Sequence, residues 1–547
     1  MGHYKESGGD IFYISEQICE VAFLTIRLIE KKTTLTRIHN MVSLVKTHNK
    51  MLFKQSKNSF IRSTEKYGYV TNQLTQFDRV YNSTGADFLR EVSREPRSIE
   101  DAVKHLLTIF EGVSKEELTQ DFQDFILDLS KHKFVIVGET NEELEAKDLD
   151  FSYSENNPKT LTSTYYQETD QKVGMSTQDY FLAEVQGTPK ISALQFELSS
   201  RCNERCIHCY IPNEKKNKGF DMPTAKVKSI LDEFADMGGL HVTLSGGEAF
   251  MHKDLMEIVE YCRQKDFKIS ILSNLISLKD EHIPVLKAAN ISLIQVSLYA
   301  IEPEIHDAIT TVKGSCEKTK AAIEKLVKAD IPVQISCPIM KTNKDVYINV
   351  LEYAKLHNIK AQADYIMMAR ADLSTDNLDQ RLSYEETETF LRSIIEHDLE
   401  YRKNTLKQIP KSEQMILDFE QFKNQPVCGV GYDNCCITTN GDVYPCAGWQ
   451  AYVLGNVYKQ SLKEIWENSE KVKNLRKITE SSFPQCLECE AFDFCARCLV
   501  RNFNESNGDM FKINPVFCEE AFLLKRLVEE YHAKGIIESP YFEDKVC

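Results

Sequence analysis

Long apolar segments are missing from this chain of 547 residues. No stretch approaches the roughly 20 consecutive apolar residues that a membrane helix needs, so we expect no membrane partner. The first ten residues, MGHYKESGGD, contain no apolar core followed by a small-residue cleavage site, which argues against a signal peptide. Together these absences predict a cytoplasmic protein.

An excess of positive charge is also missing. The chain has 66 Lys and Arg against 82 Asp and Glu, a net charge of −16. Because nucleic-acid binding depends on basic surfaces that meet the phosphates, this balance argues against a nucleic-acid partner. It is compatible with a basic peptide as partner.

Cysteine, in contrast, is abundant, with seventeen residues. Disulfides cannot account for them in a reducing compartment, and the alternative is a scatter of buried thiols that act as small apolar residues. Their positions argue against such a scatter, because nine lie between Cys428 and Cys518 and three between Cys202 and Cys209. Clustering of this kind indicates metal or iron–sulfur ligation.

The middle of the chain alternates between strand-like and helical segments. The strand-like segments are residues 193–199, 240–245, 267–273, 293–298, 332–338 and 360–366. Strands that alternate with helices predict an α/β fold with a parallel sheet, here curled into a partial (β/α)6 barrel of the TIM type. Chemistry is then expected at the C-terminal ends of the strands.

The first of these strands runs directly into a CxxxCxxC motif formed by Cys202, Cys206 and Cys209. Three thiolates in one loop can hold a 4Fe–4S cubane and leave one iron open. A structural zinc site is the alternative, with His208 as the obvious fourth ligand.

The motif matches the signature of the radical S-adenosylmethionine (radical SAM) family. This resemblance implies that S-adenosylmethionine binds the open iron and that one electron from the cluster cleaves it. The product is a 5′-deoxyadenosyl radical, which abstracts hydrogen from an unactivated C–H bond.

Polar and glycine residues at the ends of the next strands are candidates for binding S-adenosylmethionine. The second strand ends in SGGEAF, where the two glycines allow close backbone approach and the glutamate can pair with the methionine ammonium. The fourth strand reads SLYA where the family often has SLDG. An arginine after the sixth strand can reach the carboxylate or form an ordinary surface ion pair. The candidates are Gly246, Gly247, Glu248, Ser273, Asn274, Ser297 and Arg370.

The C-terminal cysteines resemble the SPASM extension of radical enzymes that modify peptides and proteins. The order that carries the resemblance is Cys428, Cys446, Cys486, Cys489, Cys495, Cys498 and Cys518, with a glycine five residues before the second. The family usually has three residues before the sixth cysteine, and this chain has two. Zinc ribbons share such CxxC pairs, but they would not explain the upstream triplet.

The resemblance implies two auxiliary 4Fe–4S clusters, so that we expect three clusters in all. One would be held by Cys486, Cys489, Cys495 and Cys518. The other would be held by Cys428, Cys446 and Cys498, with Cys435 or Cys436 as a fourth ligand. If neither binds, the vacant iron is open to a substrate thiolate.

We expect five segments along the chain: an N-terminal helical extension (1–50), a winged-helix-like domain (51–140), a linker (141–190), the radical SAM barrel (191–400) and the SPASM domain (401–547). The second segment shows a hairpin around residues 66–68, three capped helices and a closing strand at 134–137. From residue 59 to 138 it carries 10 Lys and Arg against 13 Asp and Glu, which argues against DNA binding.

The phrase VYNSTGADFLREVSREPRSIEDAVKHL instead resembles the recognition element of maturases that act on ribosomally synthesised peptides (RiPPs). This resemblance implies that a leader peptide adds a strand to the hairpin edge and lies against the third helix.

The three resemblances together predict a maturase that forms thioether links between Cys sulfur and carbon in a precursor peptide, of the sactipeptide or ranthipeptide type. We expect a flavodoxin- or ferredoxin-type reductant. Carbon–carbon cross-linking, epimerisation with a cysteine such as Cys337 as hydrogen donor, and formylglycine formation for a sulfatase are alternatives. A non-enzymatic iron–sulfur regulator is the alternative from another class.

Overall fold

The computed structural model describes residues 51–65, 67–75, 77–149, 190–212, 220–402 and 419–537. The expected extension at residues 1–50 and most of the expected linker lie outside these ranges. The chain divides into two compact units, and the smaller has described residues 51–55, 91–131 and 135–148. The larger holds residues 56–90, 132–134 and the rest of the chain from 149 onward.

The smaller unit contains a three-stranded antiparallel sheet and three helices. Its strands are β5 (Arg97–Ser98), β1 (Leu52–Gln55) and β6 (Val135–Gly138), in that order. Its helices are α4 (Ile99–Leu106), α5 (Lys115–Lys131) and α6 (Asn141–Lys147). Ser98 caps α4 by accepting from the backbone N–H of Asp101 at 3.1 Å, as its capping-box spacing predicts. Helix α6 occupies the first residues of the segment that we expected to be a linker.

The larger unit begins with an antiparallel sheet in the order β2 (Ser59–Ser63), β3 (Gly68–Asn72) and β4 (Phe77–Tyr81). Helix α3 (Ser83–Arg90) follows. The hairpin that the sequence predicted is therefore present as β2 and β3. The segment expected as one recognition domain is, however, divided between the two compact units.

The first strands of the larger unit pack on loops of its parallel sheet. The backbone N–H of Ile61 donates to Asp266 Oδ2 at 3.1 Å, and Arg62 Nε donates to the Gly239 carbonyl at 2.5 Å. Asn290 Nδ2 donates to the Lys57 carbonyl at 2.7 Å. Each of these loops precedes a parallel strand. The β2–β3–β4 sheet therefore packs against the end of the parallel sheet at which its strands begin.

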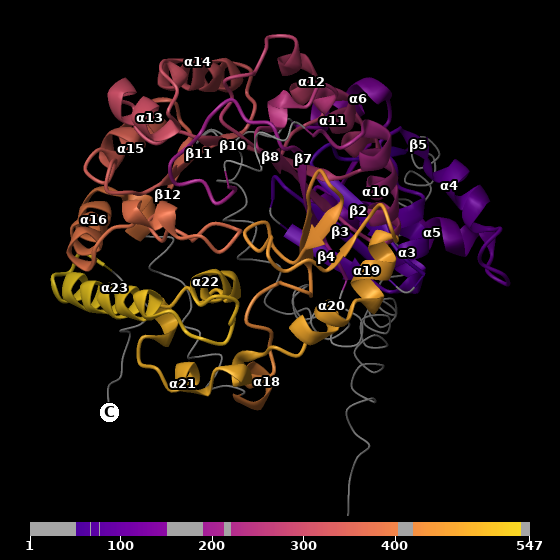
Figure 1. Ribbon diagram of the computed structural model, residues 1–547. Coiled ribbons are helices and arrows are strands. Elements are labelled where there is room, and N and C mark those ends of the chain that lie inside the picture. The colour runs from indigo at the N-terminus through magenta and orange to yellow at the C-terminus, as the bar shows by residue number, and fades with distance from the viewer. Residues whose placement is uncertain are drawn as a thin grey trace, which may run out of the picture. The chain divides into compact units, whose positions relative to one another are not determined.

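Six parallel strands form the core of the larger unit, in sequential order (Figure 1). They are β7 (Ala193–Ser199), β8 (His241–Gly246), β9 (Lys268–Ser273), β10 (Leu293–Ser297), β11 (Val333–Pro338) and β12 (Lys360–Asp364). All six segments that the sequence predicted as strands are strands here. The fold is a mixed α/β fold with a parallel sheet, while its curling into a partial barrel stays a prediction.

Helices follow the strands and lie outside them, as the arc of helices in Figure 1 shows. They bury the apolar faces of the strands, and Phe196, Leu244 and Ile271 are fully buried in the common core. The helices are α10 (Thr224–Asp236), α11 (Leu255–Gln264), α12 (His282–Ala288), α13 (Pro303–Thr310), α14 (Ser315–Lys328), α15 (Tyr347–Leu356) and α16 (Tyr384–His397). Short 3-10 helices are η3 (Ala249–Met251) and η4 (Asp376–Gln380).

The C-terminal region extends the same sheet. Strand β13 (Asn434–Ile437) pairs in parallel with β7, and β14 (Asp442–Tyr444) and β15 (Gly455–Asn456) continue the order. The helices are α18 (Phe419–Lys423), α19 (Leu462–Asn468), α20 (Glu470–Leu475), η6 (Glu480–Ser482), α21 (Pro484–Leu487), η7 (Phe492–Phe494), α22 (Leu499–Glu505) and α23 (Pro515–Ala533). The pairing of β13 with β7 places this region next to the first parallel strand.

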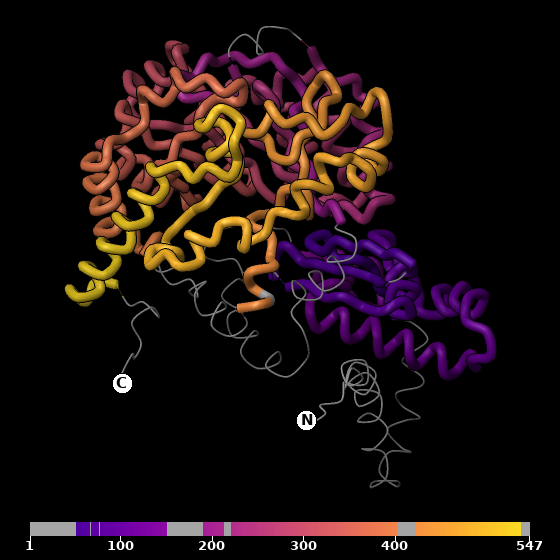
Figure 2. Tube along the Cα trace, turned by 60° about the horizontal axis from the view of Figure 1, so that its bottom comes forward, coloured from indigo at the N-terminus to yellow at the C-terminus, as the bar shows by residue number. Residues whose placement is uncertain are grey.

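Helix α23 lies beside α16, where the yellow end of the chain returns to the orange-red helix in Figure 2. Arg392 of α16 and Glu530 of α23 form an ion pair at 2.7 Å. In the part of the chain that the structure describes, a search for helices of membrane-spanning length and apolarity finds none.

Candidate active site

The three cysteines of the CxxxCxxC motif lie in the loop after β7, at the C-terminal end of the parallel sheet. They line a pocket of about 330 Å³, a size within the usual range of ligand sites. Nine of the ten residues predicted for the cluster and for S-adenosylmethionine line it: Cys202, Cys206, Cys209, Gly246, Gly247, Glu248, Ser273, Asn274 and Ser297. We call it the cofactor pocket. The fold therefore brings together residues up to 95 positions apart in the chain.

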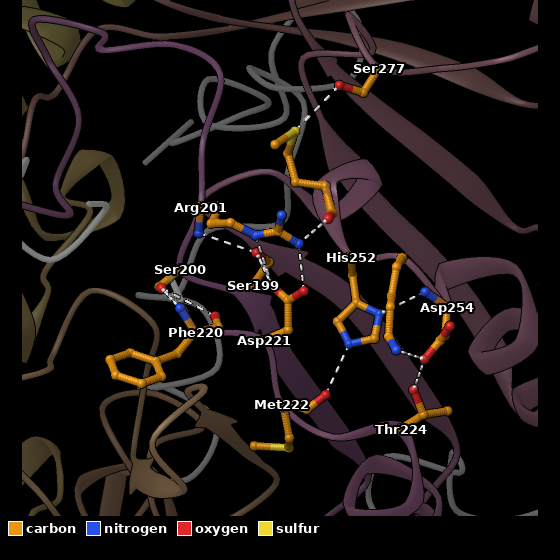
Figure 3. Close-up of polar contacts among 12 residues, drawn as sticks. Ser199, Ser200, Arg201, Phe220, Asp221, Met222, Thr224, His252, Asp254 and Ser277 are labelled. Atoms are coloured by element: carbon orange, nitrogen blue, oxygen red, sulfur yellow. Dashed lines mark hydrogen bonds and ion pairs between the residues drawn. The ribbon is translucent and has the colours of Figure 1, made fainter. Parts of the chain in front are cut away.

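An ionic network fixes the start of the cysteine loop (Figure 3). Arg201 forms an ion pair with Asp221 and also donates to the Met251 carbonyl at 2.6 Å. Ser199 Oγ donates to Asp221 Oδ1 at 2.6 Å and accepts from the backbone N–H of Arg201 at 3.1 Å. Charge-assisted hydrogen bonds of this kind restrict the backbone that carries Cys202.

A neighbouring network holds the segment after β8 in place (Figure 3). His252 Nε2 lies 2.9 Å from the Met222 carbonyl, and the backbone N–H of Asp254 donates to His252 Nδ1 at 3.2 Å. Thr224 Oγ1 donates to Asp254 Oδ2 at 2.6 Å. The tautomer with hydrogen on Nε2 satisfies both ring nitrogens of His252.

The two glycines of SGGEAF pack against the cysteine loop. Gly246 has a φ of 142°, and a Cβ there would lie 2.4 Å from the Ser199 carbonyl oxygen. A Cβ on Gly247 would lie 2.5 Å from the Arg201 carbonyl oxygen. Contact with the loop backbone therefore requires glycine at both positions. The sequence had suggested another reason, the close approach of a ligand.

Glu248 is buried at the wall of the cofactor pocket, with 2% of its surface exposed. Its carboxylate accepts from Ser273 Oγ at 2.6 Å, from the Asn274 N–H at 2.8 Å and from the Phe250 N–H at 2.9 Å. Burial raises the pKa of Glu248, and these three hydrogen bonds oppose that rise. A carboxylate oriented in this way suits a cationic ligand group such as an ammonium.

Arg370 is the one candidate that does not line the pocket. Its guanidinium forms two hydrogen bonds with Asp376, at 2.8 and 2.9 Å, and donates to the Cys209 carbonyl at 2.7 Å. It therefore braces the cysteine loop. The cation that does line the pocket is Arg501 of α22, which lies 3.5 Å from Asp364 and which no sequence motif indicated.

Tyr299 of the SLYA segment is a second residue that sequence reasoning missed. Its hydroxyl lies 3.8 Å from Cys206 Sγ, its ring meets His208 edge-on at 4.8 Å, and it stacks on His306 at 5.2 Å. Burial raises the pKa of Tyr299 well above its ordinary value, and the neighbouring Cys206 adds to the rise. The hydroxyl is thus a neutral donor beside a candidate cluster ligand. The sequence did contain one signal for this residue: Tyr299 stands two positions after Ser297, where the family often has aspartate.

Cys337, considered as a hydrogen donor, is fully buried on β11. Its thiol donates to the Tyr299 carbonyl at 3.5 Å and accepts from Asn343 Nδ2 at 3.6 Å. Burial raises its pKa well above the ordinary value. It does not belong to the residues that line the cofactor pocket.

Four C-terminal cysteines gather around one small cavity. Cys486, Cys489, Cys495 and Cys518 line it together with Cys498. Burial raises the pKa of Cys486, and the nearby guanidinium of Arg497 acts in the opposite direction. The four cysteines that the resemblance assigned to one cluster therefore lie together.

A second group lies next to the first. Burial raises the pKa of Cys428 to about 11, and the neighbouring thiols of Cys498 and Cys446 add to it. Burial also raises the pKa of Cys446, with Cys498 again nearby. Cys428, Cys446 and Cys498 are thus neighbours, as the SPASM resemblance implied.

Cys435 and Cys436 alternate along β13 and have different surroundings. Cys435 is part of the apolar core, and burial alone raises its pKa. Cys436 is fully buried, and Glu197, Cys435 and Cys446 all lie near enough to raise its pKa further. The sequence left the fourth ligand open between these two cysteines, and Cys436 is the one near Cys446.

Tyr210 connects the cofactor pocket with this second group. Its hydroxyl donates to Glu197 at 3.2 Å, and Gln450 Nε2 donates to the same oxygen of Glu197 at 2.7 Å. Burial raises the pKa of Tyr210 well above its ordinary value, and Glu197, Cys436, Cys209 and Cys446 add to it. Tyr210 therefore has cysteines of both groups as neighbours.

The donor sets consist of thiols, which is the ligand chemistry of iron–sulfur clusters. Within the described ranges, no three His, Cys, Asp or Glu side chains converge as a single metal ion would require. A cubane instead presents separate irons to its ligands, so its thiolates need not meet at a point. The residues present fit such clusters, with S-adenosylmethionine beside the first.

Two family models match the chain. The radical SAM superfamily model covers residues 196–354, which include the cysteine loop and most of the parallel sheet. The model of the SPASM iron–sulfur cluster-binding domain covers residues 428–490, which include Cys428, Cys446 and the first CxxC pair.

Curated relatives match over rather more than half of the chain. An AdoMet-dependent heme synthase of Methanosarcina barkeri is 28% identical, over 59% of this chain and 95% of that protein. The antilisterial bacteriocin subtilosin biosynthesis protein AlbA of Bacillus subtilis is 26% identical, over 57% of this chain and 68% of that protein.

Among solved structures, Streptococcus suis SuiB bound to its precursor peptide SuiA resembles this chain with a TM-score of 0.54. The match has 15% identity and covers 83% of this chain and 97% of SuiB, so it supports the fold alone. The two family models and the grouped cysteines lead to one conclusion. This chain is a radical SAM enzyme that carries a C-terminal SPASM domain.

Proposed function

We propose that this enzyme forms thioether links in a ribosomally synthesised precursor peptide, using S-adenosylmethionine and three 4Fe–4S clusters. The observation that carries the proposal is the parallel pairing of β7, which runs into the first cysteine loop, with β13 of the C-terminal region, which brings both cysteine groups to one sheet. An enzyme that must remove a hydrogen atom and then one more electron from its substrate needs two redox sites close together. A lone radical SAM site would supply only the first.

The bond accounting of a thioether agrees with this arrangement. One C–H bond and one S–H bond break, one C–S bond forms, and the peptide loses two hydrogens. Bound S-adenosylmethionine would supply the radical that takes up the hydrogen atom, the thiol would release a proton, and an auxiliary cluster would accept the remaining electron. This electron needs an acceptor, which the Cys428, Cys446 and Cys498 group would hold.

The chain's own residues have separate tasks in this scheme. Cys202, Cys206 and Cys209 would hold the first cluster, and Glu248 would orient the methionine ammonium. The bound S-adenosylmethionine would supply the hydrogen-abstracting 5′-deoxyadenosyl radical. Cys486, Cys489, Cys495 and Cys518 would hold the outer auxiliary cluster, where a flavodoxin- or ferredoxin-type reductant could exchange electrons.

The N-terminal part supports recognition of a peptide. The hairpin formed by β2 and β3 is present, and extended peptides commonly bind by adding a strand to a sheet. AlbA, by name a bacteriocin biosynthesis protein, supports a peptide substrate for this chain.

A tetrapyrrole substrate is the second candidate, favoured by the match to the heme synthase of Methanosarcina barkeri, which extends over 95% of that protein. Two observations weigh against it in this chain. The larger unit carries an additional β2–β3–β4 sheet before its parallel sheet, and AlbA matches over nearly the same share of this chain.

The experiment that tests the proposal is coexpression with a short Cys-rich open reading frame found beside the gene. We expect the peptide to lose two hydrogens per link and to lose one thiol that iodoacetamide can alkylate. A mass loss with all thiols still reactive would indicate carbon–carbon linking, and an unchanged mass with altered stereochemistry would indicate epimerisation. Conversion of an iron porphyrin with no change in the peptide would replace the proposal by the tetrapyrrole candidate.

A further inference from the structure

A second and larger cavity lies at the other side of the parallel sheet from β7. Its volume is about 530 Å³, in the range of ligand sites. Strand β12, the segment after α16, residues 493–496 and helix α23 line it. We call it the lateral cavity; Cys495 is the one candidate cluster ligand among its lining residues, and S-adenosylmethionine does not account for it.

One wall of the lateral cavity is the edge of the parallel sheet. Among the described strands, β12 is last in the order and pairs only with β11. Residues 360–363 line the cavity, so the unpaired side of the strand faces it. The Tyr347 hydroxyl is hydrogen-bonded to the backbone of Ala363, which occupies that position of the edge. An added strand would therefore pair mainly with residues 360–362. A strand edge of this kind binds an extended peptide through backbone hydrogen bonds.

The opposite wall carries a buried carboxylate without a donor. Glu520 of α23 is 9% exposed, and within the described residues its Oε2 has no hydrogen-bond partner. The two nearest guanidiniums are engaged elsewhere: Arg381 with Glu505 at 2.6 Å and Arg501 with Asp364 at 3.5 Å. Burial raises the pKa of Glu520 to about 7, so a cationic donor from a ligand would stabilise its charged form.

The charge of the lining indicates the kind of donor. Four acidic side chains line the lateral cavity, from Asp398, Glu400, Asp493 and Glu520, against one basic side chain, Lys360. Lys360 forms an ion pair with Glu400, and Asp493 also has a partner. Asp398 and Glu520 remain on the acidic side, so a cationic group is the complementary ligand.

The lateral cavity leads toward the cofactor pocket. Ile366 lines both spaces. Before it, Ala363 and Tyr365 line the lateral cavity, while Asp364 lines the cofactor pocket. A chain extended along β12 toward its C-terminal end would therefore continue to the candidate cluster.

We propose that an extended segment of the peptide substrate lies along β12 in the lateral cavity, with a lysine or arginine side chain bonded to Glu520. Its neighbouring residue then enters the cofactor pocket, where hydrogen is abstracted. The inference rests on the proposed function in one respect, that the substrate is a peptide.

The test is a binding selection by mRNA display, with a library of random ten-residue peptides. The target is the full-length enzyme, reconstituted with iron and sulfide and loaded with S-adenosylmethionine. We expect peptides that bind the wild type to be enriched in Lys or Arg at one position. Glu520→Gln should reduce this enrichment about tenfold, since a charged hydrogen bond contributes about 1.5–3 kcal/mol. Glu520→Lys should replace it by enrichment in Asp or Glu.

Glu529→Gln is the matched control, because Glu529 is exposed on the same helix and pairs with Lys525 at 2.7 Å. It should select the same peptides as the wild type. Equal basic enrichment in Glu520→Lys, or no basic enrichment in the wild type, would overturn the inference. The readout is binding without turnover, so a maturase that modifies its precursor but shows no basic enrichment would contradict only this inference.

Discussion

The hydroxyl of Tyr299 lies 3.8 Å from Cys206 Sγ, within reach of a hydrogen bond to sulfur. Tyr299 occupies the third position of the SLYA segment, and the stacked ring of His306 supports it from behind. Hydrogen bonds to cluster sulfurs stabilise the more negative, reduced state and so help to set the potential. This contact therefore links a departure from the usual family sequence to the redox chemistry of the first cluster.

Tyr299→Phe removes this donor and keeps the ring. We expect the midpoint potential of the S-adenosylmethionine-binding cluster to become more negative, measured by electron paramagnetic resonance during a redox titration. Tyr458→Phe is the control, because Tyr458 is exposed at 50% and lies away from the pocket lining. Equal potentials in Tyr299→Phe and the wild type would show that the hydroxyl does not act on the cluster.

Cys202, Cys206 and Cys209 can be replaced together by Ala to test the first cluster. We expect loss of 5′-deoxyadenosine formation under anaerobic, reducing conditions, with about eight of about twelve irons per chain retained. Liquid chromatography of the nucleoside and iron analysis are the two measurements. Continued formation of 5′-deoxyadenosine would contradict the site, and an iron content near four in the wild type would contradict the auxiliary clusters.

Cys436→Ala and Cys435→Ala form a matched pair at neighbouring positions of one strand. We expect Cys436→Ala to alter the electron paramagnetic resonance signal of one auxiliary cluster, because Cys436 has Cys446 as a neighbour. Cys435→Ala should leave iron and signal unchanged and lower stability by about 1 kcal/mol, because it removes a buried core atom. The reverse pattern would assign the ligand to Cys435, and two unaltered spectra would indicate an open iron.

Acid should destabilise the native state in part through His241. Burial lowers the pKa of His241 to about 4, with Lys268 adding to the effect, and its Nε2 lies 2.9 Å from Ser270 Oγ. The native imidazole stays neutral while the unfolded chain takes up a proton below pH about 6.5. The stabilisation is therefore present above pH about 6.5 and is lost as pH falls toward 4.

Between pH 7.5 and 5.5 this group should account for about 1 kcal/mol of lost stability. His241→Gln should show a smaller loss than the wild type in urea unfolding at the two pH values. His357→Gln is a useful comparison, since His357 lies at the C-terminus of α15 and is not packed under the sheet. If both variants lose stability as the wild type does, His241 is not the responsible group.

Local sequence patterns determined much of the fold. Alternation of apolar residues and the helices between them predicted six strands, and each lies within a few residues of its expected place, from β7 (Ala193–Ser199) to β12 (Lys360–Asp364). Capping pairs such as Ser98 with Asp101 marked helix starts, because the cap is a contact between near neighbours. The order of the C-terminal cysteines resembles that of the SPASM family, and this resemblance implied the two C-terminal groups.

Other features depend on contacts between distant segments. Arg501 reaches the cofactor pocket from an element far along the chain, and no local pattern marks it. For Arg370 the sequence left open a contact with the ligand or an ordinary ion pair, and the structure shows an ion pair with Asp376.

The sequence by itself determined the strands, because they follow from periodicity along the chain, and its cysteine motifs carry the resemblance that implied the cysteine groups and the enzyme family. Only the tertiary structure decided that Cys436 rather than Cys435 is the neighbour of Cys446, since adjacent residues of a strand point to opposite faces. It also decided that Glu520 and the edge of β12 face one cavity, because that juxtaposition requires α23 to return to a strand about 155 residues earlier.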